Sequence, residues 1–108
     1  MRGSPGTRLR RPAIELPRAA VADFCRRHRV RELALFGSVL RSDFDAASDV
    51  DVLIELDPEA RLGFGFVRLE DELAAIIGRR VDLRTRGDLS RHFREQVLQD
   101  RHVVYSAP

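Results

Sequence analysis

Residues 35–54 decide the fold class of this chain, and they read LFGSVLRSDFDAASDVDVLI. An apolar run at residues 32–36 predicts a short buried strand that ends at Gly37. Ser38 is a good helix N-cap, so a short helix is expected through residues 39–41, followed by a turn at residues 44–48. From residue 50 to residue 56, apolar and acidic side chains alternate, which predicts a second strand with one apolar face.

Asp49 and Asp51 are candidate metal ligands in that second strand. Side chains two residues apart in a strand project from the same face, so the two carboxylates stand side by side. They repel each other unless cations neutralise them, and carboxylate oxygens are ligands that Mg²⁺ accepts. Two such ions about 4 Å apart are typical of displacement at phosphorus. For an isolated Asp-x-Asp pair, a solvent-exposed strand start is the better interpretation.

Gly37 and Ser38 are candidate phosphate contacts. Gly37 has no side chain, so a phosphate can approach the backbone closely. Ser38 offers a hydroxyl donor, and the helix start behind it offers unpaired N–H groups. An ordinary strand–turn–helix junction with a capping serine would have the same sequence. Arg41, one helical turn beyond Ser38, is equally compatible with phosphate contact and with a solvent-facing position, and it joins the candidate nucleotide-binding residues.

Asp82 is the third candidate carboxylate, in a short apolar strand expected at residues 81–83. If this strand lies beside the strand that carries Asp49 and Asp51, the three carboxylates converge. The alternative is a strand-edge aspartate paired with a neighbouring arginine, and residues 79, 80 and 84 are all arginines. Taken together with the Gly-Ser pair, the pattern favours a common site.

The remaining elements complete an alternating order of helices and strands. Helical spacing of apolar residues predicts a helix of about three turns after Pro17 and a second helix over residues 66–77, with Gly78 as its C-cap. Gly63 and Gly65 lie in the preceding loop or at the start of that helix. Asp88 is expected to cap a last helix, and residues 102–105 are expected to be extended. This order favours an α/β or α+β fold, a sheet flanked by helices.

Composition limits the possible classes of protein. A chain of 108 residues forms one small domain. We expect a disordered Arg-rich tail at residues 1–13 and a single domain at residues 14–108. All 19 basic residues are arginines, but the net charge is only +2, so direct nucleic-acid binding is not expected. The single cysteine excludes an internal disulfide, and no apolar run approaches the roughly 20 residues of a membrane span. We expect a cytoplasmic protein without membrane association.

The pattern Gly-Ser, ten residues, Asp-x-Asp and a later aspartate on another strand resembles the signature of the minimal nucleotidyltransferases (MNT), in the DNA polymerase β-like superfamily. Gly37, Ser38, Asp49, Asp51 and Asp82 match that signature position by position. The resemblance implies a small mixed β-sheet flanked by helices. It also implies that Asp49 and Asp51 bind two Mg²⁺ ions, that Asp82 binds the catalytic one, and that Ser38 and nearby N–H groups hold the phosphates of ATP.

The resemblance covers residues 14–105 and carries an expectation about biology. Small MNT proteins are commonly encoded beside HEPN-domain ribonucleases as antitoxins, and several transfer AMP from ATP to a tyrosine of that partner. We therefore expect an Mg²⁺-dependent protein adenylyltransferase that acts as the antitoxin of a HEPN toxin, alone or in a homo- or hetero-oligomer. Two alternatives stay open: an antitoxin that inhibits only by binding, and a nucleotidyltransferase for a small-molecule acceptor.

Overall fold

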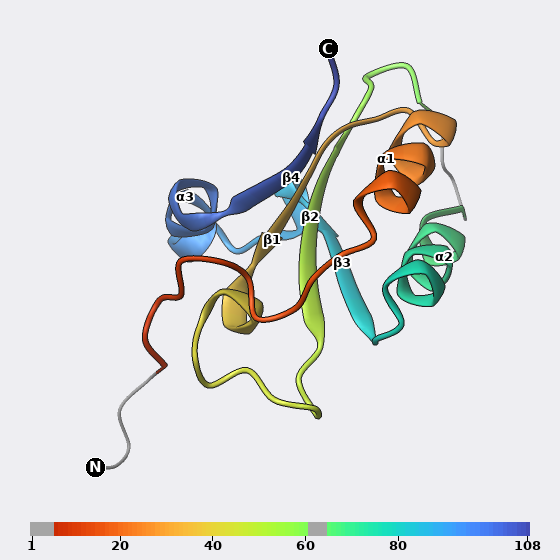
Figure 1. The fold of residues 1–108 in the computed structure, drawn as a ribbon. Coiled ribbons are helices and arrows are strands. Elements are labelled where there is room, and N and C mark those ends of the chain that lie inside the picture. Colours follow the sequence, from red (N-terminus) through yellow and green to blue (C-terminus); the bar gives the residue numbers. More distant parts are fainter. Residues whose placement is uncertain (1–5, 61–64) are drawn as a thin grey trace.

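The computed structural model describes residues 6–60 and 65–108, and within them a mixed sheet with helices on both faces (Figure 1). In chain order the elements are α1 (Arg18–Arg27), β1 (Val30–Phe36), the 3₁₀ helix η1 (Gly37–Leu40), β2 (Val50–Leu56), α2 (Gly65–Ile77), β3 (Val81–Thr85), the 3₁₀ turn η2 (Arg86–Asp88), α3 (Arg91–Asp100) and β4 (His102–Ser106). The α/β class predicted from the sequence is confirmed.

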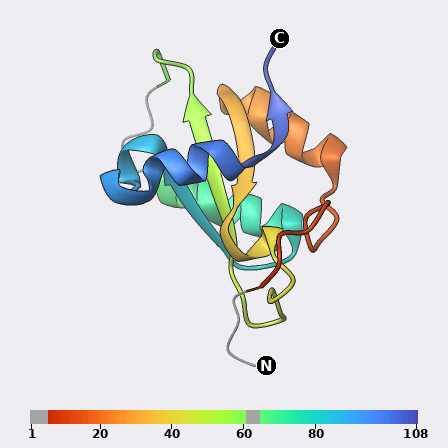
Figure 2. The same cartoon turned by 90° about the vertical axis from the view of Figure 1, so that its left-hand side faces the viewer.

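The sheet has the strand order β3-β2-β1-β4. Strand β1 pairs antiparallel with both β2 and β4, whereas β2 and β3 run parallel. The parallel pair requires a crossover connection, and α2 supplies it. Helices α1 and α2 cover one face of the sheet, and α3 crosses the other face (Figures 1 and 2). The result is the small mixed sheet flanked by helices that the sequence predicts.

The alternation in β2 decides which side chains face which layer. Val50, Val52 and Ile54 are buried in the main core with residues of α1 and α2, such as Phe24 and Leu73. Side chains in between point to the opposite face, since successive residues of a strand alternate. On that face Leu53 packs with Phe36 and Leu89 in a smaller cluster, against which Val97 and Leu98 of α3 pack. Asp51 therefore lies on the α3 face of the sheet.

The start of α3 corrects one prediction. Ser90 is the N-cap, and its hydroxyl accepts a hydrogen bond from the backbone N–H of His92 at 3.2 Å. The prediction that Asp88 caps this helix is wrong. Its carboxylate instead accepts hydrogen bonds from the backbone N–H and the hydroxyl of Thr85, both at 3.0 Å, and so closes η2. Leu89 lies between the two turns, and its side chain is buried in the smaller core cluster.

The end of α2 agrees with the prediction for Gly78. This residue has φ +79°, and its N–H donates to the Ala74 carbonyl at 2.8 Å, as expected of a C-cap glycine. Gly65 is the first residue of α2, whereas Gly63 lies outside the described residues. Among the described residues, no helix combines the length and apolar character that a membrane span requires.

The described part of the N-terminal segment runs along η1. The N–H of Leu9 donates to the Leu40 carbonyl at 2.8 Å, and the N–H of Ala13 donates to the Val39 carbonyl at 2.7 Å. The N–H of Ser42 donates in turn to the Thr7 carbonyl at 2.9 Å. These hydrogen bonds join the segment to the η1 region, and the composition of the segment does not reveal them.

Candidate active site

The sheet brings Asp51 and Asp82 together. They are direct partners in the parallel register of β2 and β3, where neighbouring strands lie about 4.8 Å apart. Val81 and Leu83 pack against the main core, so Asp82 projects to the opposite face, as Asp51 does. Asp49 immediately precedes β2 and lies two residues from Asp51. The three candidate carboxylates therefore arise from adjacent positions of two neighbouring strands, on the face that α3 crosses.

Gly37 lies directly against Asp51. Phe36 is the cross-strand partner of Asp51, and Gly37 follows it with φ +74°. A Cβ atom at this position would overlap Oδ2 of Asp51 and lie 3.1 Å from its Cγ. Both the backbone conformation and the close carboxylate therefore require glycine. The sequence predicts this glycine for the approach of a phosphate, and the structure adds the approach of Asp51 as a second reason.

Asp51 has an unusual electrostatic environment. Burial of its carboxyl group, together with the negative charges of Asp82 and Asp49, raises the pKa from 3.8 to about 6. The positive charges of Arg84 and Arg41 oppose this rise in the pKa. A half-buried carboxylate among other carboxylates is destabilised in its charged form, so a bound cation would relieve that repulsion.

Asp49 and Asp82 are each paired with an arginine. Nε of Arg80 lies 2.9 Å from Oδ1 of Asp49, and Nε of Arg84 lies 2.9 Å from Oδ1 of Asp82. The Asp82 pair is the alternative that the sequence left open. Within residues 6–60 and 65–108, no group of three acidic, histidine or cysteine side chains has ligand atoms gathered as in a formed metal site. The carboxylates of Asp49 and Asp82 instead face their arginine partners.

These ion pairs are compatible with a metal site because they are accessible. The side chain of Asp49 is 49% exposed and that of Asp82 is 36% exposed. Exposed ion pairs contribute about 0–1 kcal/mol, so exchanging an arginine for a divalent cation costs little. The donor atoms are all carboxylate oxygens, which suit a hard cation such as Mg²⁺. The residues present therefore fit the two ions that the resemblance implies.

Ser38 lies within η1, so it is not the N-cap predicted from the sequence. The N-cap position belongs to Phe36, and no side chain caps this short helix. The turn starts at Gly37, which has a positive φ, two residues earlier than expected. Arg41 follows η1, where its N–H donates to the Ser38 carbonyl at 2.9 Å and its Nε lies 3.5 Å from Oδ1 of Asp43. The expected α-helical turn through residue 41 is a 3₁₀ turn that ends at Leu40.

A cavity of about 470 Å³ lies between η1 and α3, next to the Gly-Ser turn. Gly37, Leu40 and Arg41 line one wall, and Phe93 and Val97 of α3 line another. Phe93 is 47% exposed where it lines the cavity, and the apolar spacing of this helix does not distinguish it from residues that face the sheet.

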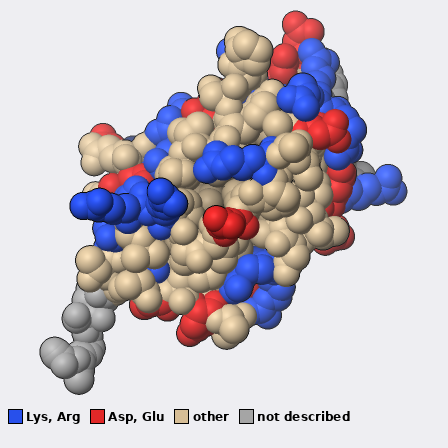
Figure 3. All heavy atoms as spheres, viewed as in Figure 1, with Lys and Arg blue, Asp and Glu red and all other residues tan. Residues whose placement is uncertain are grey.

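Charges of both signs are spread over one face of the molecule. In the view of Figure 3, arginine and acidic side chains are interspersed among uncharged residues, at the centre of this face as well as around it. This mixture agrees with the small net charge of +2.

Residues 18–105 match the family model of the nucleotidyltransferase domain, and this range includes all the candidate site residues. The chain belongs to the nucleotidyltransferase domain family. It is 39% identical over 79 residues to the protein adenylyltransferase MntA of Thermococcus cleftensis, a match that covers 73% of this chain and 77% of that protein. The family is that of an enzyme, and the signature residues Gly37, Ser38, Asp49, Asp51 and Asp82 occur in this nucleotidyltransferase in the order that the resemblance requires.

Two solved structures extend the comparison. A structure described provisionally as a minimal nucleotidyltransferase superposes with a TM-score of 0.65 at 34% identity, covering 78% of this chain and 85% of that chain. The structure of a toxin–antitoxin with AMP-PNP superposes with a TM-score of 0.62 at 22% identity, covering 85% and 75% of the two chains. The fold of this nucleotidyltransferase is thus the polymerase β-like fold expected from the sequence.

Proposed function

We propose that this nucleotidyltransferase transfers AMP from ATP to a hydroxyl group of a partner toxin and thereby acts as its antitoxin. The observation that carries the proposal is the direct pairing of Asp51 with Asp82, with Gly37 packed against Asp51. The 39% identity to a protein adenylyltransferase, MntA, supports a protein acceptor and AMP as the transferred group. A relative of the same fold is a toxin–antitoxin crystallised with AMP-PNP, which supports a nucleotide and a toxin partner.

In this proposal Asp49 and Asp51 would hold two Mg²⁺ ions, and Asp82 would share the catalytic one. When bound, the ions would neutralise the triphosphate and lower the pKa of the attacking hydroxyl. Asp51 lies against Gly37 of the Gly-Ser turn and beside Asp82. The Ser38 hydroxyl donates to the phosphates, and Arg41 at the end of the same turn contributes positive charge. Most of the catalysis is therefore positioning and charge neutralisation.

The acceptor hydroxyl would approach from the open side of Asp82. Its oxygen attacks the α-phosphorus, the bond to the bridging oxygen of pyrophosphate breaks, and the hydroxyl proton passes to the Asp82 carboxylate. The products are an adenylylated hydroxyl and pyrophosphate. Asp82 is half-exposed in β3, an edge strand of the sheet, so a side chain presented by another protein can reach it.

We further propose that the partner is a HEPN-domain ribonuclease and that the acceptor is a tyrosine near its active site. An adenylyl group there adds bulk and negative charge where RNA phosphates must bind, so it would repel the substrate. The reaction would take place in the cytoplasm. A single buried cysteine, Cys25, is compatible with a reducing compartment.

The test is incubation of the purified protein with its partner, Mg²⁺ and ATP labelled at the α-phosphate. We expect the partner to carry the label, and mild treatment that cleaves phosphodiesters should release it. With Asp82→Asn in place of the wild type, the partner should carry no label. In cells, the double variant Asp49→Asn, Asp51→Asn should bind the toxin yet fail to neutralise it. Neutralisation by that variant at an equal dose would instead identify an antitoxin that acts by binding alone.

A further inference from the structure

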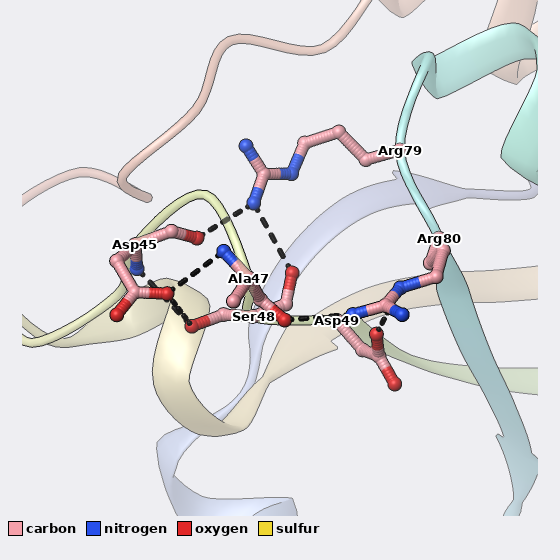
Figure 4. A network of polar contacts seen from close by, with 6 residues as sticks. All are labelled: Asp45, Ala47, Ser48, Asp49, Arg79 and Arg80. Carbon is pink, nitrogen blue, oxygen red and sulfur yellow. Dashed lines mark hydrogen bonds and ion pairs between the residues drawn. The ribbon is translucent and has the colours of Figure 1, made fainter.

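The loop that leads into the metal-binding strand is held by two adjacent arginines, Arg79 and Arg80, from the turn between α2 and β3 (Figure 4). One guanidinium nitrogen of Arg79 donates to two backbone carbonyls of the loop, those of Asp45 at 2.8 Å and Ser48 at 3.1 Å. A guanidinium nitrogen of Arg80 donates to a third carbonyl, that of Ala47, at 2.8 Å. Three backbone carbonyls of the loop are thus tied to the beginning of β3.

Arg79 makes one more contact that Arg80 does not. Its guanidinium carbon lies 4.5 Å from the centre of the Phe44 ring, a cation–π arrangement. A planar guanidinium can stack on a ring with its face while its edge donates hydrogen bonds, and a lysine ammonium cannot do both. Arg79 therefore contacts the loop at three residues, Phe44, Asp45 and Ser48. Arg80, whose side chain is 74% exposed, reaches Ala47 and the Asp49 carboxylate.

The loop itself is preformed where the arginines hold it. Oδ1 of Asp45 accepts hydrogen bonds from the Ala47 N–H at 2.9 Å and from the Ser48 hydroxyl at 3.2 Å. Directly after the loop, the N–H of Val50 donates to the Arg80 carbonyl at 2.9 Å, beside the first register pair of β2 and β3. The arginine contacts and the strand pairing therefore join the same two segments, and together they set where Asp49 and Asp51 stand relative to Asp82.

We propose that Arg79 is a positioning residue of the active site: it fixes the loop at residues 44–48 to the start of β3, and so holds Asp49 and Asp51 in register with Asp82. Its contacts are to carbonyls and a ring, so it touches neither the carboxylates nor the reacting atoms. The consequence for catalysis rests on the proposed function, because only there do the three aspartates share ligands. Supporting groups of this kind typically affect metal affinity or activity by about 10- to 100-fold.

Arg79→Met and Arg80→Met are a matched pair of variants. Each removes one positive charge, but we expect opposite effects on Mg²⁺ binding because the two side chains make different contacts. Removing either positive charge would, by electrostatics alone, strengthen the binding of Mg²⁺. Arg80→Met also removes the competitor for the Asp49 carboxylate, so we expect unchanged or tighter Mg²⁺ binding. Arg79→Met frees the loop, so we expect Mg²⁺ binding at least tenfold weaker in spite of the lost positive charge. Arg26→Met, on the exposed end of α1, is the control without a contact to the loop.

Mg²⁺ binding would be measured by calorimetry on the full chain with AMP-PNP, and the loop by hydrogen exchange without metal. Arg79→Met should speed the exchange of the Val50 amide and the loop amides severalfold, with Arg79→Lys intermediate and Arg26→Met unchanged. If Arg79→Met does not fold, Phe44→Leu, which removes the stacking ring but keeps an aliphatic side chain against the main core, should show a smaller change in the same direction. Unchanged loop exchange and Mg²⁺ affinity in the folded variants would overturn the assignment of Arg79.

Asp51→Asn separates this inference from the proposed function. Loss of Mg²⁺ binding in Asp51→Asn together with normal binding in Arg79→Met would refute the role of Arg79 and leave the proposed function intact. Normal Mg²⁺ binding in Asp51→Asn would refute the metal site of the proposed function. In that case, faster loop exchange in Arg79→Met would still support the contact between Arg79 and the loop. That contact would have no consequence for catalysis.

Discussion

Asp51→Asn should make the metal-free protein more stable while it removes the response to Mg²⁺. The wild-type carboxyl group is half-buried beside Asp82 and Asp49, and this environment raises its pKa from 3.8 to about 6. The ionised form is therefore disfavoured in the folded protein relative to the unfolded chain. Asparagine has nearly the same shape without the charge, so it avoids this cost.

The expected gain in the free energy of unfolding follows from the raised pKa of Asp51. A rise from 3.8 to about 6 corresponds to about 3 kcal/mol, at about 1.4 kcal/mol per pH unit. Solvent screening at the exposed part of the side chain reduces the expected gain of Asp51→Asn to about 2 kcal/mol at neutral pH. For a domain of this size that gain raises Tm by roughly 8 °C.

The difference in stability between Asp51→Asn and the wild type should depend on pH. Well below pH 3.8 the Asp51 carboxyl group is protonated in both the folded and the unfolded state, so the variant gains nothing, and at pH 4 its gain is still small. As the pH rises through the range from 4 to 6, only the unfolded chain ionises freely, and wild-type stability falls relative to the variant. Above about pH 6 the group is ionised in both states and the full difference persists.

The assay is thermal or urea unfolding of both proteins at several pH values between 4 and 8, with and without Mg²⁺ and AMP-PNP. We expect the Asp51→Asn gain to grow from near zero at pH 4 to its full value above pH 6. We expect Mg²⁺ with the nucleotide to stabilise only the wild type, since a ligand stabilises the state that binds it. A variant that is less stable than the wild type at pH 7.5, or a gain that is independent of pH, would refute the reasoning.

Three further predictions test the supporting structure. Gly37→Ala should destabilise the protein by about 2 kcal/mol or more, since the new Cβ meets Asp51 at a positive φ, and urea unfolding measures this; a loss below about 0.5 kcal/mol would contradict the described contact. Ser90→Ala should cost about 1 kcal/mol through the lost N-cap of α3, which the same assay detects; equal stability would argue against the cap. Burial raises the pKa of the Cys25 thiol to about 12, so a thiol reagent at pH 8 should label it only after unfolding, and rapid labelling of the folded protein would disprove its burial.

Much of the fold could be predicted because local patterns and tertiary packing agree. The alternation at residues 50–56 gives the two faces of β2, and the Gly-Ser pair correctly marks the end of β1. That β3 lies beside β2, with Asp82 opposite Asp51, does not follow from periodicity. The combination of the Gly-Ser pair with the three aspartates favours this arrangement, and the resemblance to a known family implies it.

Other features could not be predicted because they depend on competition between partners. Asp88 and Ser90 are both suitable caps, and the burial of Leu89 between them decides which one starts α3. Residues 7–13 have the composition of a disordered segment, but backbone groups around η1 provide hydrogen-bond partners. Arg79 and Arg80 are ordinary surface residues in the sequence. Their contacts with the loop appear only once the turn before β3 lies next to it.

The most direct test of the account is the mass of the purified partner toxin after incubation with this protein, ATP and Mg²⁺. We expect the partner to gain the mass of one or more adenylyl groups, with pyrophosphate released in equal amount. Asp82→Asn should leave the mass unchanged while it still forms the complex. A partner that gains no mass although it is neutralised, or that gains the same mass with Asp82→Asn, would contradict the claim that paired carboxylates on β2 and β3 carry out adenylyl transfer.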